Sequence, residues 1–100
     1  MIQIGIRSPL PREVYDWTLA RGVVTITAQD VHETGPAGIA RRICEVVGDA
    51  PVFLSIDIDV LDPAFAPATG TPEIGGLASW QMQAILRQLL ELQFVGMDLV

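Results

Sequence analysis

The strongest strand signal in the chain reads Val52-Phe-Leu-Ser-Ile-Asp-Ile-Asp59. Its apolar residues fall on both faces, which is typical of a strand in a parallel sheet that is covered on both sides. Two aspartates stand at its carboxyl end, where ligands bind in open α/β sheets. This stretch is therefore predicted to be a central strand that delivers two carboxylates to a site.

Strand and helix patterns alternate on either side of this central strand. Further strands are predicted at Ile2–Ile6, Val23–Thr27 and Phe94–Val100, helices at Pro9–Arg21, Pro36–Val47 and Trp80–Leu92 with Ser79 as the N-cap of the last, and a polar loop at Gln29–Thr34. Repeated strand–helix–strand units predict parallel pairing, with helices on both faces of one sheet. The expected fold class is α/β, a three-layer α/β/α arrangement with a parallel sheet, in one domain over residues 1–100.

The segment from Val60 to Ala78 interrupts this alternation. It holds three Pro and three Gly and shows no regular period. Loops of this length inside compact domains are usually functional or disordered. Disorder is not expected here, because the apolar residues Leu61, Phe65, Ile74 and Leu77 need a surface to pack against.

Composition and charge narrow the possible partners and compartments. The net charge is −6 and all six basic residues are Arg, so no basic stripe points to nucleic acid. No apolar run approaches the ~18 residues of a membrane span, and no signal peptide pattern is present. One Cys excludes an internal disulfide, which makes a cytoplasmic location the default expectation.

Asp57 and Asp59 are two residues apart, so on a strand both carboxylates project from the same face. One explanation is structural, with one aspartate capping the next loop and the other bonded to backbone amides. The other is a metal ion, because two ionised carboxylates repel each other unless a cation lies between them. Oxygen ligands favour a hard ion such as Mn²⁺ or Mg²⁺.

The run around these aspartates resembles the signature of a known family. Residues 55–76 read Ser-Ile-Asp-Ile-Asp-Val-Leu-Asp-Pro-Ala-Phe-Ala-Pro-Ala-Thr-Gly-Thr-Pro-Glu-Ile-Gly-Gly, which is similar to the binuclear-metal ureohydrolases, the arginase/agmatinase family. The flanking runs Gln3-Ile-Gly-Ile-Arg-Ser8 and Gly96-Met-Asp-Leu-Val100 are similar to that family's neighbouring strands. The resemblance is strongest to agmatinases and implies an arginase-like fold, of which this chain would be the C-terminal part of the domain.

The resemblance implies a Mn-dependent amidinohydrolase. Family members hold two Mn²⁺ ions with four aspartates and two histidines, and at the matched positions Asp57 would bridge both ions and Asp59 would bind one. A metal-bridging hydroxide then attacks the guanidinium carbon and releases urea and an amine. The implied substrate is agmatine, on a route to polyamines, or a related small guanidino compound, and the implied assembly is a homo-oligomer, a trimer or hexamer.

The departures from the family pattern matter equally. The stretches that supply the other four ligands, Gly-Gly-Asp-His and Asp-Ala-His-x-Asp, are absent, and the only histidine, His32, matches neither. The glutamate that lies near the substrate in family members follows the last strand and is also absent. The isolated chain is therefore expected to be incomplete and inactive, and the alternative is a non-catalytic truncated remnant that folds or assembles without hydrolase activity.

Other residues receive structural expectations. His32 is expected in a solvated loop, not in a metal cluster, and Cys44 as a buried structural thiol. Asp62 is expected to fix the turn after the central strand by bonding backbone amides. Asp98 is a candidate to support the metals. A further group either braces the loop or contacts substrate: Thr69, Gly70, Thr71 and Glu73.

Overall fold

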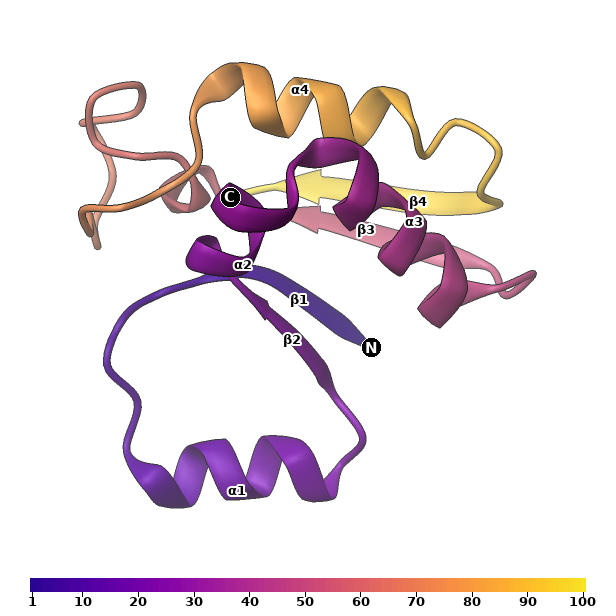
Figure 1. Cartoon of the computed structure of the whole chain (residues 1–100), viewed down its shortest axis with the longest axis horizontal. Coiled ribbons are helices and arrows are strands. Elements are labelled where there is room, and N and C mark those ends of the chain that lie inside the picture. Colours follow the sequence, from indigo (N-terminus) through magenta and orange to yellow (C-terminus); the bar gives the residue numbers. More distant parts are fainter.

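The computed structural model of the protein describes residues 1–100 and alternates strands with helices (Figure 1). The strands are β1 (Ile2–Ile6), β2 (Val24–Thr27), β3 (Val52–Ile56) and β4 (Phe94–Leu99). The helices are α1 (Arg12–Ala20), α2 (Ala28–Thr34), α3 (Pro36–Val47) and α4 (Ser79–Arg87), with a 3₁₀ turn, η1 (Ile58–Val60), after β3. No helix combines the length and apolar character needed to cross a membrane.

All strand pairing is parallel, as predicted. β1 pairs with β2 and β3 pairs with β4, and the two pairs form separate two-stranded sheets within this chain. β3 and β4 both run toward the loop of residues 60–78, which lies beyond their carboxyl ends (Figure 1). The α/β class with parallel strands is therefore confirmed, and the strand order leaves the sheet in two pieces.

The hydrophobic core lies between three helices and the base of the long loop. Leu61 and Leu77, from the two ends of that loop, are buried in it together with residues of β2, α2, α3, α4 and the turn after α4. The buried cluster comprises Ile26, Ala28, Val31, Ile39, Ala40, Ile43, Leu61, Leu77, Ile85 and Leu89. The loop is thus anchored in the core at both ends. The prediction that Phe65 and Ile74 also pack is wrong, since they are 52% and 81% exposed on the part of the loop outside the core.

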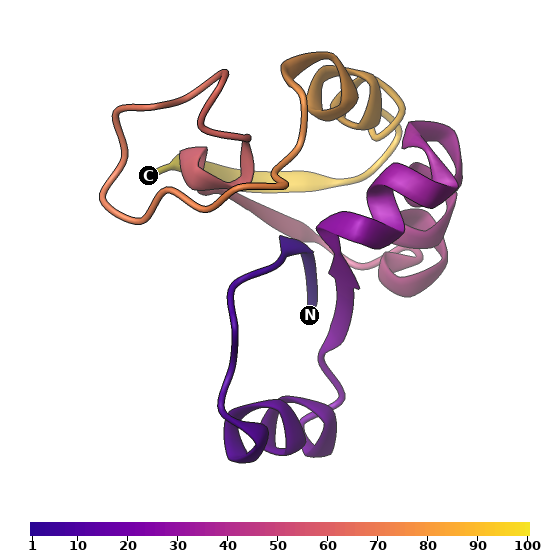
Figure 2. The same cartoon turned by 60° about the vertical axis from the view of Figure 1, so that its left-hand side comes forward.

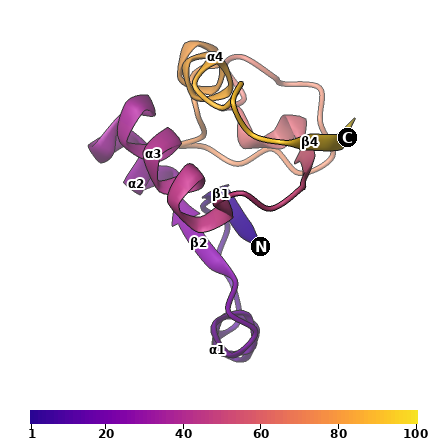
Figure 3. The same cartoon turned by 90° about the vertical axis from the view of Figure 1, so that its right-hand side faces the viewer.

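The side of the molecule away from this core is far less covered by helices than the sequence predicts. No residue of α1 is buried, and this helix lies apart from the others (Figures 2 and 3). Phe53 of β3 is 62% exposed and Met97 of β4 is 67% exposed. α1 lies away from β3 and β4, and the expectation of helices on both faces of this strand pair is not met within this chain (Figures 2 and 3).

Three helices differ from the predicted ones. α1 begins at Arg12 and not at Pro9, with Pro11 as its N-cap, and ends at Ala20. Residues 28–34 form α2 where a loop was predicted, because Thr27 and Asp30 make a capping box: the Asp30 N–H donates to Thr27 Oγ1 at 3.0 Å and the Thr27 N–H donates to Asp30 Oδ2 at 2.8 Å. α4 has Ala78 and not Ser79 as its N-cap, since Gln81 Oε1 accepts from the Ala78 N–H at 2.9 Å. The same helix ends at Arg87, where turns begin that bury Leu89.

Gly76 closes the base of the loop by close backbone contact. A Cβ at this position would lie 2.6 Å from the carbonyl carbon of Leu61 and 2.7 Å from Asp62 Cα, and backbone atoms cannot move aside as a flexible side chain can. We expect Gly76→Ala to destabilise the chain by about 1–3 kcal/mol, the usual result of overpacking. Gly70→Ala, in the same loop with nothing within 4 Å, should change stability by less than about 0.5 kcal/mol. Urea unfolding of both variants measures the difference, and equal midpoints would contradict it.

Candidate metal centre

The central strand ends three residues earlier than predicted. β3 stops at Ile56, and Asp57 then caps η1 by accepting the Asp59 N–H on its Oδ1 at 3.1 Å. A short aspartate side chain competes for the backbone amide two residues on and turns the chain. The prediction that Asp57 and Asp59 lie on one face of a strand is therefore wrong, because Asp59 belongs to the 3₁₀ turn.

The turn nevertheless leaves both aspartates with free acceptor capacity. Thr71 Oγ1 donates to Asp59 Oδ2 at 2.7 Å, across the long loop. Asp57 Oδ2 and Asp59 Oδ1 accept no hydrogen bond from the protein. Asp57 is exposed and Asp59 half-buried. Each carboxylate is thus fixed through one oxygen, and the other oxygen remains available to a cation or to water.

This donor set fits a hard metal ion in part. Carboxylate oxygens are the ligands that Mn²⁺ and Mg²⁺ prefer. No group of three or more His, Cys, Asp or Glu side chains in the structure is arranged to hold a metal ion. The assignment of Asp57 and Asp59 as metal ligands therefore stays a prediction, and two carboxylates alone would leave such an ion incompletely coordinated.

Backbone and side-chain bonds close the loop that brings Thr71 to Asp59. At its base the Asp62 N–H donates to the Leu77 carbonyl at 2.9 Å, and the Leu77 N–H donates to the Val60 carbonyl at 3.0 Å. The Asp62 carboxylate accepts three backbone N–H groups, from Ala64 at 2.9 Å, Gly75 at 3.0 Å and Gly76 at 3.2 Å. The predicted role of Asp62 is confirmed.

His32 occupies a different place from the one predicted. It lies on α2, and its Nε2 is 3.1 Å from the Gly75 carbonyl while its Nδ1 is 3.3 Å from Gln81 Nε2. Because Gln81 Nε2 can only donate, Nδ1 accepts and Nε2 carries the proton that it donates to Gly75. His32 therefore joins α2 to the end of the loop and to the start of α4, and is not a loop residue.

Three other residues complete the description of this region. Cys44 is half-buried beside the core and not fully buried. Asp98 stands opposite Ser55 in the β3–β4 register, and its side chain makes no hydrogen bond, so its support of the metals stays a prediction. Sequence reasoning missed Arg7, whose Nη2 donates to the carbonyls of Asp59 and Glu73, both at 2.7 Å. The sequence signal that could have indicated Arg7 is a single charged side chain at the end of an apolar strand.

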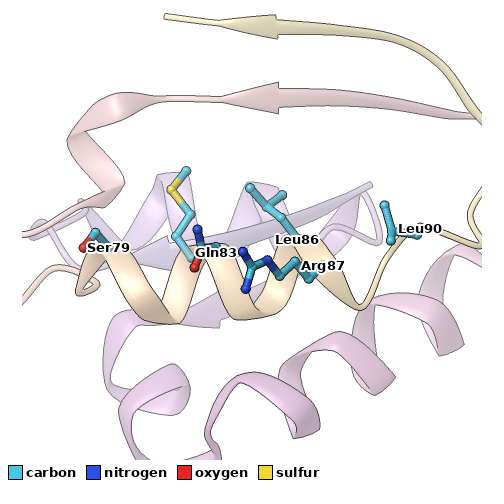
Figure 4. Close-up of a pocket in the computed structure, with 6 residues that line it drawn as sticks. Ser79, Gln83, Leu86, Arg87 and Leu90 are labelled. Carbon is cyan, nitrogen blue, oxygen red and sulfur yellow. The ribbon is translucent and has the colours of Figure 1, made fainter.

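A hollow on α4 is unrelated to these carboxylates (Figure 4). It is lined by residues of α4 and the turn after it, namely Ser79, Met82, Gln83, Leu86, Arg87 and Leu90. Binding pockets usually have walls from several elements and a few converging polar groups. This surface has one wall, so no ligand is assigned to it.

Comparison with known proteins identifies the family. The model of the arginase family matches residues 1–100. The chain is 54% identical over 100 residues to putative agmatinase 3 of Schizosaccharomyces pombe, covering 99% of this chain and 24% of that protein. It is 43% identical over 99 residues to the agmatinase of Enterobacter sp. (strain 638), covering 99% of this chain and 30% of that protein. The crystal structure of proclavaminate amidinohydrolase from Streptomyces clavuligerus superposes with a TM-score of 0.90 at 48% identity, over 99% of this chain and 32% of that one.

The chain belongs to the arginase family, and its fold is the fold of the matching part of an arginase-family hydrolase. It spans between about a quarter and a third of the length of these relatives. The matched residues include Asp57, Asp59 and the whole loop between them and α4.

The Asp62 carboxylate, which accepts three backbone N–H groups of the loop, makes the stability of the chain depend on pH in the acid range. The Ala64 N–H holds the pKa of Asp62 below its ordinary value, burial opposes this, and the Gly75 and Gly76 amides and the Arg7 charge add to the lowering. A lowered folded-state pKa stabilises the fold above the unfolded value of 3.8, and this stabilisation is lost as the pH falls through the lowered pKa. We expect Asp62→Asn to be less stable than the unsubstituted chain near neutral pH, and the two unfolding midpoints to converge below about pH 4. A constant gap between them would contradict this assignment.

Proposed function

We propose that this chain is the part of a Mn²⁺-dependent amidinohydrolase that supplies Asp57 and Asp59 to a pair of metal ions. The observation that carries the proposal is the pair of unpartnered oxygens, Asp57 Oδ2 and Asp59 Oδ1, beyond the end of β3 and beside a closed loop. Membership of the arginase family and the relatives named as agmatinases support it.

Each residue has a distinct part in this proposal. Asp57 would hold both ions and Asp59 one of them, while the Thr71 hydroxyl orients Asp59 through Oδ2. Bound metal would supply the activation of water that hydrolysis of a guanidinium group to urea and an amine requires. The Asp57 carboxylate is the costlier loss of the two, because both ions depend on it.

The substrate proposed is agmatine or a related small guanidino compound. This choice rests on the relatives named agmatinase, at 54% and 43% identity. Under the same proposal the enzyme serves polyamine formation in the cytoplasm and works as a homo-oligomer, a trimer or hexamer.

The metal role of Asp57 is tested in a complete enzyme that carries this chain. In this protein, called the graft, residues 1–100 replace the matching 99-residue segment of the Enterobacter agmatinase. We expect Asp57→Asn to lower urea release from agmatine by more than about 100-fold, because even residues that merely support ligands cost 10–100-fold. Metal content, measured by atomic absorption, should fall with it.

Asp49→Asn is the matched control for this test. It makes the same chemical change at an exposed residue after α3, away from the loop. It should leave both turnover and metal content unchanged. Full turnover and full metal content in Asp57→Asn would exclude the proposed role.

The chain by itself is expected to be inactive. Two carboxylates are too few ligands to hold two ions in a fixed geometry, because metal affinity depends on ligand count and on supporting hydrogen bonds. The measurement is urea release from agmatine by purified residues 1–100 in the presence of Mn²⁺. Turnover of about 1 s⁻¹ or faster would show that the missing ligands come from another source.

A second candidate function is assembly without catalysis. The observation that favours it is the set of apolar side chains left in solvent on β4 and α1, with Val95 70% and Trp17 58% exposed. Val95, Met97 and Leu99 alternate along β4 and are all at least 66% exposed, and a contiguous apolar surface of this kind marks a place where proteins associate. Sedimentation of the chain, measured alongside the urea assay, separates assembly from catalysis. Assembly is favoured if the chain self-associates and the graft neither binds Mn²⁺ nor releases urea.

A further inference from the structure

Arg7 makes an unusual set of contacts for an arginine. It follows β1 and is half-buried, and its Nε and Nη2 donate to the Glu73 carbonyl at 3.0 and 2.7 Å while Nη2 also donates to the Asp59 carbonyl at 2.7 Å. Longer bonds reach the carbonyls of Gly5, Val60 and Leu61. Every acceptor is backbone oxygen, and the ion pairs of this structure involve other arginines. Its role is therefore to bind backbone and not to neutralise an acid.

The two short bonds join separate parts of the chain. Asp59 lies in the 3₁₀ turn and Glu73 on the far side of the loop, and neither carbonyl accepts an amide N–H from the turns and loops. Two residues before Glu73 stands Thr71, whose hydroxyl holds Asp59 Oδ2. The planar guanidinium thus fixes the distance between Asp59 and the loop segment that carries Thr71, the side-chain partner of Asp59.

We propose that Arg7 is a positioning residue for the Asp59 carboxylate, acting through the backbone carbonyls of Asp59 and Glu73. The inference rests on the proposed function, since it gives Asp59 a metal to bind. Arg7 itself touches neither carboxylate oxygen of Asp59. It sets the geometry in which Oδ2 stays with Thr71 and Oδ1 remains free.

Lysine at this position lacks this planar group. Its ammonium has N–H groups for both carbonyls, as Nη2 has, but it lacks the Nε–H that makes the second bond to Glu73 and the rigid plane that fixes the direction of these bonds. In the graft, Arg7→Lys should weaken Mn²⁺ binding by about tenfold or more, measured by calorimetric titration of the metal-free protein with Mn²⁺ alone. Arg7→Gln, whose amide still donates to one carbonyl, is the second variant and should show the same loss. Arg12→Lys, at a side chain 93% exposed, is the control and should leave the affinity unchanged.

A double-mutant cycle separates positioning from general support of the fold. Thr71→Val removes the hydroxyl on Asp59 and should weaken Mn²⁺ binding by a similar factor. If Arg7 acts by presenting Thr71 to Asp59, then Arg7→Lys added to Thr71→Val weakens binding by less than about twofold more, because the interaction it serves is already gone. Independent losses would multiply, and that result would overturn the proposal.

The remaining outcomes are also decisive. Mn²⁺ affinity within about twofold of the unsubstituted graft in both Arg7→Lys and Arg7→Gln would overturn the proposal even if the melting temperature falls, since that is the signature of a residue that only supports the fold. Failure of the proposed function is recognised separately, by full metal content and turnover in Asp57→Asn. Loss in Asp57→Asn with no loss in either Arg7 variant rejects the positioning role alone.

Discussion

Two backbone hydrogen bonds between residues 60–62 and Leu77 hold the long loop closed, and the rest of the candidate site depends on them. They join the beginning and the end of a segment that has no regular structure of its own, and Leu77 is 2% exposed, so the junction is sealed in the core. Burying a backbone amide or carbonyl without a partner is expensive, so this pairing allows the loop to enter the core at all. Asp62 then satisfies three more N–H groups just outside the junction.

Parallel topology explains why the polar side chains meet. β3 and β4 end on one side of the molecule, and the contacts of Arg7 with the turn after β3 bring the end of β1 to the same place. Residues more than fifty positions apart in sequence, such as Arg7 and Asp59, thus become neighbours. The loop adds Thr71 from outside the strands. Strand ends supply the charged groups, and the loop supplies the groups that orient them.

Much of this arrangement follows from local sequence patterns. The apolar runs locate all four strands, and Pro36 with Gly48 bounds α3 at the observed residues. The predicted end of β3 is wrong because the apolar alternation continues through Ile58, whereas the Asp59 N–H donates to the Asp57 side chain and the strand ends at Ile56. The Thr27–Asp30 capping box that begins α2 is present in the sequence, but the polar composition of residues 29–34 favours a loop.

The role of Arg7 and the closure of the loop were not predictable in the same way. Both depend on contacts between positions far apart in the chain, such as Arg7 with Glu73 or Asp62 with Gly76. Periodicity reports only on neighbours within a turn or a strand. The spacing of Asp57 and Asp59 at the end of an apolar run marks them as candidate ligands, the family resemblance assigns each a role, and their geometry requires the fold.

The isolation of α1 has a consequence for how this region changes over time. With nine residues and none of them buried, α1 gains little from packing, and helices of this length are marginal when they stand alone. The crossover from β1 to β2 therefore opens more readily than the rest of the chain. Opening of α1 leaves the carboxylates undisturbed, because they lie at the other end of the fold and are held by the loop and not by this helix.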